Sequence, residues 1–350
     1  MKRKDWNSEL SEYIKQGEPT QTYKAKIWET AIGLQDVDGL KTSDYLIETA
    51  KEHIEGNINI DEAKKRINSY YKIQSNRTKE IEESEEADKV SVRITEILSE
   101  KTFSFSPTEL LSIHKRLFTD IYKEAGQYRM YNFTKEEWVL NGDTVIYSSY
   151  ENIKDTLQYD FEQEKKFSYE GLSLDESIKH LSKFISDIWQ VHPFCEGNTR
   201  TVAVFLIKYL RTFGFDLDES VFKENSWYFR NALVRANYNN FNKNVYEDIS
   251  YLNKFFYNLL TTKKYELKNR FLHIDNIKNK EEINKSYNYT LEEQAIINII
   301  KENPKITQKE ISEKINKSLR TVKTYMQEMQ DKNMLERKNG KKSGEWIINI

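Results

Sequence analysis

Cysteine, proline and glycine are scarce in this chain of 350 residues, which has one cysteine, four prolines and 11 glycines. The single cysteine, Cys195, excludes an internal disulfide and any cysteine-rich metal site. So few prolines and glycines leave little room for the many tight turns of an all-β fold. The fold is therefore expected to be mainly α-helical.

Long hydrophobic runs and an excess of one charge are also lacking. No stretch of about 18 uncharged apolar residues occurs, which excludes a membrane-spanning helix. The N-terminus has basic residues but no apolar segment typical of a secretion signal, so a cytoplasmic location is expected. The 54 basic and 56 acidic residues leave a net charge of −2, which predicts no global attraction to nucleic acid or membrane.

What the chain does have is length and aromatic content. At about 150 residues per domain, its length predicts two to three domains. Aromatic residues make up 13%, which favours packed cores over disorder. Shifts in pattern divide the chain into an N-terminal helical module (1–75), a central domain (76–260), a linker with a helix (261–289) and a small C-terminal domain (290–350).

The central section contains two patterned helices joined by a short loop. Ser173 and Glu176 form a capping box at the start of the first helix, and apolar residues follow at helical spacing. That helix is expected to end near His192, because a proline disfavours helical geometry in the residue before it. The second helix is predicted over 199–213, with Gly214 as its C-terminal cap.

The loop between these helices carries residues suited to phosphate chemistry. Backbone amides at the start of the second helix favour an anion, and Arg200 in its first turn can bind phosphate oxygens. Glu196 offers a hard oxygen ligand for Mg²⁺, and His192 can take a proton from a hydroxyl. These residues predict a phosphoryl- or nucleotidyl-transfer site. The alternative from the residues alone is an ordinary turn with a histidine cap.

The string HPFCEGNTR (192–200) resembles the signature loop of the Fic family, which reads HPFx(D/E)GN, a variable residue, Arg, two residues and a second Arg. The resemblance extends to the helices of about 90–260. It implies transfer of AMP from Mg·ATP to a Ser, Thr or Tyr hydroxyl of a target protein. The implied roles are His192 as general base, Glu196 as Mg²⁺ ligand, Gly197, Asn198 and Thr199 around the phosphate, Arg200 on the β-phosphate, and Phe194 as the loop's anchor.

Two positions depart from the family's pattern. Thr199 stands where most AMP-transferring members have Gly and a phosphorylating branch has Lys. Ala203 replaces the second Arg, which in the family reaches the γ-phosphate and, in inhibited members, pairs with a glutamate. The loss of one charged hydrogen bond costs about 1.5–3 kcal/mol, which weakens ATP binding without abolishing it.

Two further elements resemble parts of the family's fold. Asn141-Gly142 lies between β-prone runs and predicts a β-hairpin. It resembles the flap that holds the target by strand addition. The segment 226–238 resembles the helix on the adenine side. Candidate target-docking residues are Trp138, Val139, Leu140, Thr144, Val145 and Ile146, and candidate adenine contacts are Tyr228, Asn231 and Asn237.

The N-terminal section resembles the helical antitoxin modules that inhibit Fic domains through Ser or Thr, three residues, then Glu. Two alignments place the acid at Asp38 or at Glu55, and neither retains the hydroxyl, since Leu34 or Lys51 stands in its place. With the second Arg also missing, residues 20–75 are expected to dock mainly as structure. Inhibition by Glu55 is the competing hypothesis.

The C-terminal domain resembles a winged helix-turn-helix. A capping box of Thr307 and Glu310 starts its second helix, Ser318–Met329 forms the third, and the chain then alternates around Asn339-Gly340 like a hairpin wing. Its 12 basic and nine acidic residues leave a small positive bias. If the third helix recognises DNA, Arg320, Thr321 and Lys323 face the major groove. A docking or dimer module is the alternative.

The sequence thus predicts a mainly α protein: a Fic-type helical core with a β-hairpin flap, and a small winged helix-turn-helix domain. The expected function is protein adenylyltransferase, with ATP as co-substrate, Mg²⁺ and a target protein as partner. The alternatives are transfer from another nucleotide donor, and a nucleotide-sensing, DNA-binding regulator with a weak or inactive core.

Overall fold

Helices make up most of the computed structural model, which describes residues 6–74, 77–215, 217, 220–262, 264–276, 289–338 and 344–349. Within those residues the one sheet is a pair of strands near the C-terminus. The expectation of a mainly α fold is therefore confirmed. No helix of the described part is long and apolar enough to cross a membrane.

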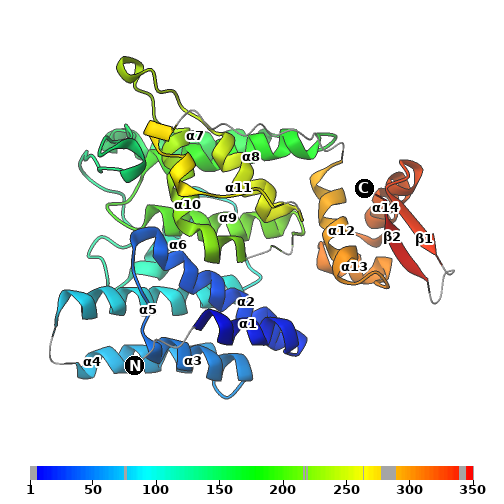
Figure 1. Cartoon of the computed structure of the whole chain (residues 1–350), viewed down its shortest axis with the longest axis horizontal. Helices are drawn as coiled ribbons and strands as arrows, with labels where there is room; N and C mark the ends of the chain where they lie inside the picture. Colours follow the sequence, from blue (N-terminus) through cyan, green and yellow to red (C-terminus); the bar gives the residue numbers. More distant parts are fainter. Residues whose placement is uncertain are drawn as a thin grey trace.

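The N-terminal module packs beside the central helices (Figure 1, blue). Its second helix has two buried faces: Ile27 and Ala31 belong to the main hydrophobic core, whereas Trp28 and Ile32 belong to a smaller core that the module forms together with Val92. Because one helix serves both cores, the module is firmly attached to the central domain. The module's helices are α1 (Trp6–Gln16), α2 (Pro19–Gly33), η1 (Leu34–Asp38, 3₁₀), α3 (Asp44–Glu55) and α4 (Ile60–Ile73).

The central domain is a bundle of helices around the predicted pair. The Ser173–Glu176 capping box starts α8, which ends at Val191, and the next helix begins at Asn198. Both helices are almost wholly buried on their apolar faces, which places the loop between them inside the domain. The domain's helices are α5 (Lys79–Ser99), α6 (Pro107–Phe118), α7 (Ile153–Lys166), α8 (Leu174–Val191), α9 (Asn198–Thr212), α10 (Ser220–Ala236) and α11 (Ser250–Leu260), with short 3₁₀ turns η2 (Trp138–Leu140), η3 (Tyr150–Asn152) and η4 (Phe241–Lys243).

The linker departs from its prediction where the structure describes it. Residues 264–276 contain two 3₁₀ turns, η5 (Asn269–Phe271) and η6 (Ile274–Asn276), and no α-helix. The remainder of the expected linker helix, 277–288, lies outside the described residues.

The C-terminal domain lies to one side of the central helices (Figure 1, orange to red). It comprises α12 (Leu291–Glu302), α13 (Gln308–Lys314), α14 (Leu319–Asp331), β1 (Leu335–Lys338) and β2 (Glu345–Ile348). The strands are antiparallel, with Leu335 opposite Ile348 and Lys338 opposite Glu345. This register confirms a wing, whereas the expected Asn339-Gly340 turn lies outside the described residues.

Candidate active site

The loop between α8 and α9 begins where Pro193 ends the first helix. His192 takes a left-handed conformation, with φ of 49° and ψ of 60°. Arg129, which is 2% exposed, holds this turn, since its Nε donates to the His192 carbonyl at 2.8 Å and its backbone N–H donates to the Pro193 carbonyl at 2.9 Å. Arg129 is a positioning residue that the sequence patterns did not single out.

The rest of the loop is closed by Asn198 and Gly197. The Asn198 side chain accepts from the Phe194 N–H at 3.0 Å and donates to the Phe194 carbonyl at 2.8 Å. Gly197 has φ of +74°, and a Cβ there would lie 2.4 Å from the Phe118 ring, so both the backbone and the space require glycine. Asn198 therefore shapes the loop through its side chain, and Phe194 is buried in the core at 1% exposed.

His114 supports the loop from α6. Its ring stacks on Phe194 at 3.7 Å between centroids, its Nδ1 accepts from the Gly126 N–H at 2.8 Å, and its Nε2 lies 3.1 Å from the Glu196 carbonyl oxygen. Because Nδ1 accepts a hydrogen bond, the ring carries its proton on Nε2. Burial lowers the pKa of His114 to about 4, so the ring is neutral and structural.

The His192 ring packs among aromatic side chains, and the residue is 5% exposed. Tyr147 stacks on its ring at 3.9 Å, and Trp189 meets it edge-on at 5.2 Å. Burial first, and the charge of Lys135 second, lower the pKa of His192 well below its usual value. The imidazole is therefore neutral at ordinary pH, which is the form that accepts a proton. Among the described residues its Nδ1 has no hydrogen-bond partner.

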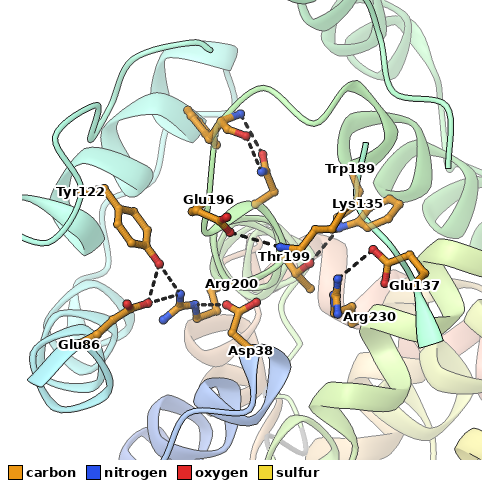
Figure 2. A network of polar contacts seen from close by, with 12 residues as sticks. Asp38, Glu86, Tyr122, Lys135, Glu137, Trp189, Glu196, Thr199, Arg200 and Arg230 are labelled. Atoms are coloured by element: carbon orange, nitrogen blue, oxygen red, sulfur yellow. Dashed lines mark hydrogen bonds and ion pairs between the residues drawn. The ribbon is translucent and has the colours of Figure 1, made fainter. Parts of the chain in front are cut away.

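Arg200 is 1% exposed and is held by groups from both the central domain and the N-terminal module (Figure 2). Its Nη2 lies 2.6 Å from Glu86 Oε1, while its Nε lies 2.8 Å from Asp38 Oδ2 and its Nη1 donates to Gln35 Oε1 at 3.1 Å. Burial opposes its charge, yet Asp38, Tyr122 and Glu86 together raise the pKa of Arg200 above its usual range.

The contact of Asp38 distinguishes the two candidate inhibitory acids. Asp38, in η1, reaches the first motif arginine rather than a second one, because position 203 is alanine. Glu55 instead is exposed and bonds to Tyr13 and Asn57 within the module. Asp38 is therefore the acid placed at the site, and Glu55 is not.

A cavity of about 640 Å³ opens beside the loop. Glu196 extends into it and pairs with Lys135, whose Nζ lies 3.2 Å from Glu196 Oε2 (Figure 2). Arg230 also lines it and pairs with the buried Glu137 at 2.8 Å. The lining residues are Asp36, Val37, Asp38, Gly39, Leu40, Glu83, Glu86, Tyr122, Lys135, Glu196, Trp227 and Arg230.

The structure places the three candidate adenine contacts away from this cavity. Tyr228 and Asn231 are 2% and 1% exposed, and Asn231 Nδ2 donates to Asn269 Oδ1 at 2.7 Å. Asn237 donates to Ser186 Oγ at 2.8 Å. Helix α10 instead turns its neighbouring face, with Trp227 and Arg230, toward the cavity.

The register of α10 was hidden by a break in the helix. Asn225 has non-helical φ of −133° and ψ of 26°, so periodicity cannot be followed through it. Beyond the break, residues three apart share a face of the helix. Tyr228 and Asn231 form the buried pair, and Trp227 and Arg230 form the neighbouring pair. A helical pattern started at Trp227, after the break, would have predicted that Trp227 and Arg230 share one face of α10.

Thr199, at the variable motif position, turns its side chain inward. Its Oγ1 accepts from Trp189 Nε1 at 2.9 Å, and the residue is 5% exposed. The side chain thus packs between α8 and α9, and only its backbone amide remains for an anion at the start of α9.

The predicted β-hairpin flap is not a pair of strands. Asn141 and Gly142 do have positive φ, 59° and 83°, so the turn chemistry is right. However, Trp138–Leu140 forms the 3₁₀ turn η2, and the reversal is closed by Glu137 N–H to the Asp143 carbonyl at 3.0 Å. The chain therefore reverses in a wider loop, because Val139 and Leu140 point into the core.

Burial divides the candidate docking residues into two groups. Val139, Leu140 and Val145 are at most 1% exposed and belong to the core. Trp138 and Ile146 are 48% and 81% exposed. Thr144 Oγ1 accepts from the Lys135 N–H at 3.1 Å, which ties this loop to the segment that carries the cavity lysine.

In the C-terminal domain, α14 presents a polar face. Arg320 and Lys323 are exposed, while Thr321 bonds to the helix cap Ser318 through both its N–H and its hydroxyl. Thr321 therefore serves the helix start first. The exposed pair is what this helix offers to a partner.

Comparison with known proteins places these features in families. Residues 104–210 match the Fic/DOC family, and residues 293–336 match a winged helix-turn-helix DNA-binding family. A crystal structure of a Fic family protein from Desulfovibrio desulfuricans G20 aligns over 99% of this chain and 95% of that chain, with a TM-score of 0.41 and 9% identity, a likeness too loose to support a further conclusion.

Two curated relatives are similar to the central part. Protein adenylyltransferase VbhT of Bartonella schoenbuchensis is 27% identical over 158 residues, which cover 42% of this chain and 32% of that protein. Probable protein adenylyltransferase y4lH of Sinorhizobium fredii is 29% identical over 126 residues, which cover 36% of this chain and 62% of that protein. The chain thus matches less than two thirds of either relative. The chain carries a Fic/DOC-family match over residues 104–210, which include the loop between α8 and α9, and a winged helix-turn-helix match over residues 293–336.

Proposed function

We propose that this chain is a protein adenylyltransferase, which transfers AMP from ATP to a hydroxyl of a target protein. The observation that carries the proposal is the neutral, buried His192 next to the start of α9, in a loop held by Arg129, His114 and Asn198. The relatives' names, adenylyltransferases, favour AMP over other groups.

The chemistry follows from the loop's arrangement. The target hydroxyl gives its proton to the His192 imidazole as its oxygen forms a bond to the α-phosphorus. The bond from that phosphorus to the bridging oxygen breaks, and pyrophosphate leaves with the electron pair. The amides in the first turn of α9 have no intrahelical partners and stabilise the charge on the phosphate oxygens.

Glu196 has the chemistry to hold Mg²⁺. Its carboxylate is half exposed on the cavity, and Mg²⁺ is usually bound by one or two carboxylates plus waters and phosphate oxygens. No group of three or more His, Cys, Asp or Glu side chains that could hold a metal ion occurs in the described residues. When bound, Mg²⁺ would neutralise phosphate charge. In the present structure the Glu196 carboxylate pairs with Lys135 instead.

Self-labelling with ATP that carries the label on the α-phosphate tests the proposal. We expect label on the wild-type protein and its loss in His192→Ala, with no label from γ-labelled ATP. His180→Ala, which removes an imidazole that bonds to Glu164 outside the loop, is the matched control and should retain label. Equal labelling of wild type and His192→Ala would contradict the proposal. A panel of other labelled nucleotides tests whether the protein uses a donor other than ATP.

A second candidate is a DNA-binding regulator whose Fic core senses nucleotide without turnover. It is favoured by Ala203 and by the tight hold on Arg200. The exposed Arg320 and Lys323 of α14 would then contact DNA. Nucleotide-dependent binding to duplex DNA, in a protein that transfers no label, would favour this candidate over the first.

A further inference from the structure

Two basic side chains line the cavity, and neither belongs to the signature loop. Lys135 comes from the loop before η2, and Arg230 comes from α10. Both lie close enough to His192 for their charges to lower its pKa. Elements far apart in the sequence thus bring two cations to the place where the reacting phosphate would bind.

The signature loop itself cannot supply a second guanidinium. Position 203, where the family's pattern has Arg, is an alanine that is 0% exposed within α9. Arg200 alone would have to neutralise the phosphates beyond the reacting one. A polyphosphate in a partly dehydrated cavity needs more than one charge-assisted contact to offset its lost hydration.

Arg230 fits this task better than Lys135. Lys135 Nζ already faces the carboxylate of Glu196 at 3.2 Å. The side chain of Arg230 is 14% exposed and is fixed through one nitrogen only, since its Nη2 bonds to Glu137 Oε1 at 2.8 Å. No other hydrogen bond of this guanidinium occurs among the described residues, so its remaining donors are available. A planar group held in this way is preorganised for phosphate.

We propose that Arg230 binds the terminal phosphates of the nucleotide donor and supplies the cationic contact that Ala203 cannot. The proposal rests on the proposed function of the same cavity. It assigns a binding role to a residue outside the signature loop, on a helix that the motif does not include. Glu137 positions the guanidinium, and Arg230 itself touches the donor.

The test measures the affinities of AMP, ADP and ATP by calorimetry, in the full chain carrying Asp38→Ala so that Arg200 is partly released. Adding Arg230→Gln should weaken ATP and ADP binding about tenfold or more, the usual range for a lost charged hydrogen bond. AMP affinity should change less than about threefold, because AMP lacks the terminal phosphates. Arg230→Lys should recover part of the ATP affinity.

Two controls distinguish binding from structure. Lys243→Gln removes an exposed cation that pairs with Asp143 at 3.5 Å, and it should leave all three affinities unchanged. Glu137→Gln removes the charge of the positioning partner and should retain the preference for ATP over AMP.

Each result decides between the two proposals. Equal losses for AMP, ADP and ATP in Arg230→Gln, or the same losses in Glu137→Gln, would show that Arg230 only supports Glu137, and would overturn the inference while the proposed function stands. If no nucleotide binds to the Asp38→Ala protein, both the inference and the proposed function fail.

Discussion

The two modules that flank the central domain are attached to it in different ways. The N-terminal module reaches the candidate active site, where the Asp38 carboxylate and the Gln35 amide contact Arg200. The C-terminal domain makes its contacts outside the cavity, where Asn298 Nδ2 donates to the Leu260 carbonyl at 3.0 Å and Lys301 Nζ donates to Thr262 Oγ1 at 2.9 Å. One module can therefore compete with a ligand of the site, and the other cannot.

The charge of the cavity strengthens this contrast. Two of its carboxylates, on Asp36 and Asp38, come from the N-terminal module and face the same space as the loop. Together with Glu83, Glu86 and Glu196 they outnumber the cations Lys135 and Arg230 in the lining. We expect this excess of carboxylates to repel a polyphosphate while the module is in place, so release of Asp38 should raise activity.

The largest effect is expected from Asp38→Ala. The change removes one carboxylate from a buried guanidinium that keeps Glu86 as a partner, so Arg200 stays paired and becomes available to phosphate. The initial rate of self-labelling should rise about 10- to 100-fold, which corresponds to about 1.4–2.7 kcal/mol. Glu55→Gly, at the exposed alternative acid, is the control and should leave the rate unchanged; a rise in Glu55→Gly alone would reverse the assignment.

The attachment of the C-terminal domain is tested by Gly214→Ala. Gly214 has φ of +85°, and a Cβ there would lie 2.5 Å from the Ile315 Cβ. We expect the free energy of unfolding to fall by about 2–4 kcal/mol, from backbone strain and the clash together.

Denaturant unfolding and limited proteolysis measure this change. Gly171→Ala is a matched control, because its φ is +78° and no atom lies within 4 Å of its Cβ position. A loss no greater than that of Gly171→Ala would show that the contact is unimportant. The rate of labelling should stay near the wild-type value in the folded protein.

A smaller effect is expected from the pH dependence of transfer. His192 must be neutral to act, and its pKa lies below the usual value of about 6.5, so the wild-type rate should persist well below that pH. Lys135→Gln removes one of the charges that lower this pKa. The acid limb of kcat/KM should therefore move upward, by about half a pH unit to one.

The measured quantity is the pH at which the acid limb of kcat/KM lies, not the maximal kcat/KM. The maximal value can change for another reason, because Lys135 also contacts Glu196. Lys243→Gln, which removes an equal charge from the surface, should leave the limb in place. An acid limb that stays unchanged or moves downward in Lys135→Gln would exclude this electrostatic role.

The smallest effect on catalysis is expected from Arg320→Gln with Lys323→Gln. If α14 binds DNA, each change removes about one phosphate contact and lowers the slope of log K against log salt by about one. Labelling should be unaffected, because α14 does not line the cavity. Lys268→Gln, outside the C-terminal domain, serves as control. A salt slope equal to that of wild type would speak against this face as the DNA contact.

Local signals predicted the helices well and the loop's surroundings poorly. Capping boxes at Ser173 and Thr307 and the proline after His192 act within a few residues, so the sequence reveals them. Arg129 and His114 support the loop from 63 and 82 positions away in the chain, so no local pattern marks them. The hairpin prediction was wrong at Val139 and Leu140 because burial there overrode β propensity.

By itself, the sequence determined the helical class and the loop that ends α8 and starts α9, because caps and breakers act within a few residues along the chain. It also showed that this loop carries the candidate residues His192, Glu196 and Arg200. The tertiary structure alone decided that Arg200 is shared with Asp38, that His192 is neutral, and that α10 turns Arg230 rather than Asn231 toward the cavity. These features depend on burial and on charges from distant segments, whose distances only the folded chain sets.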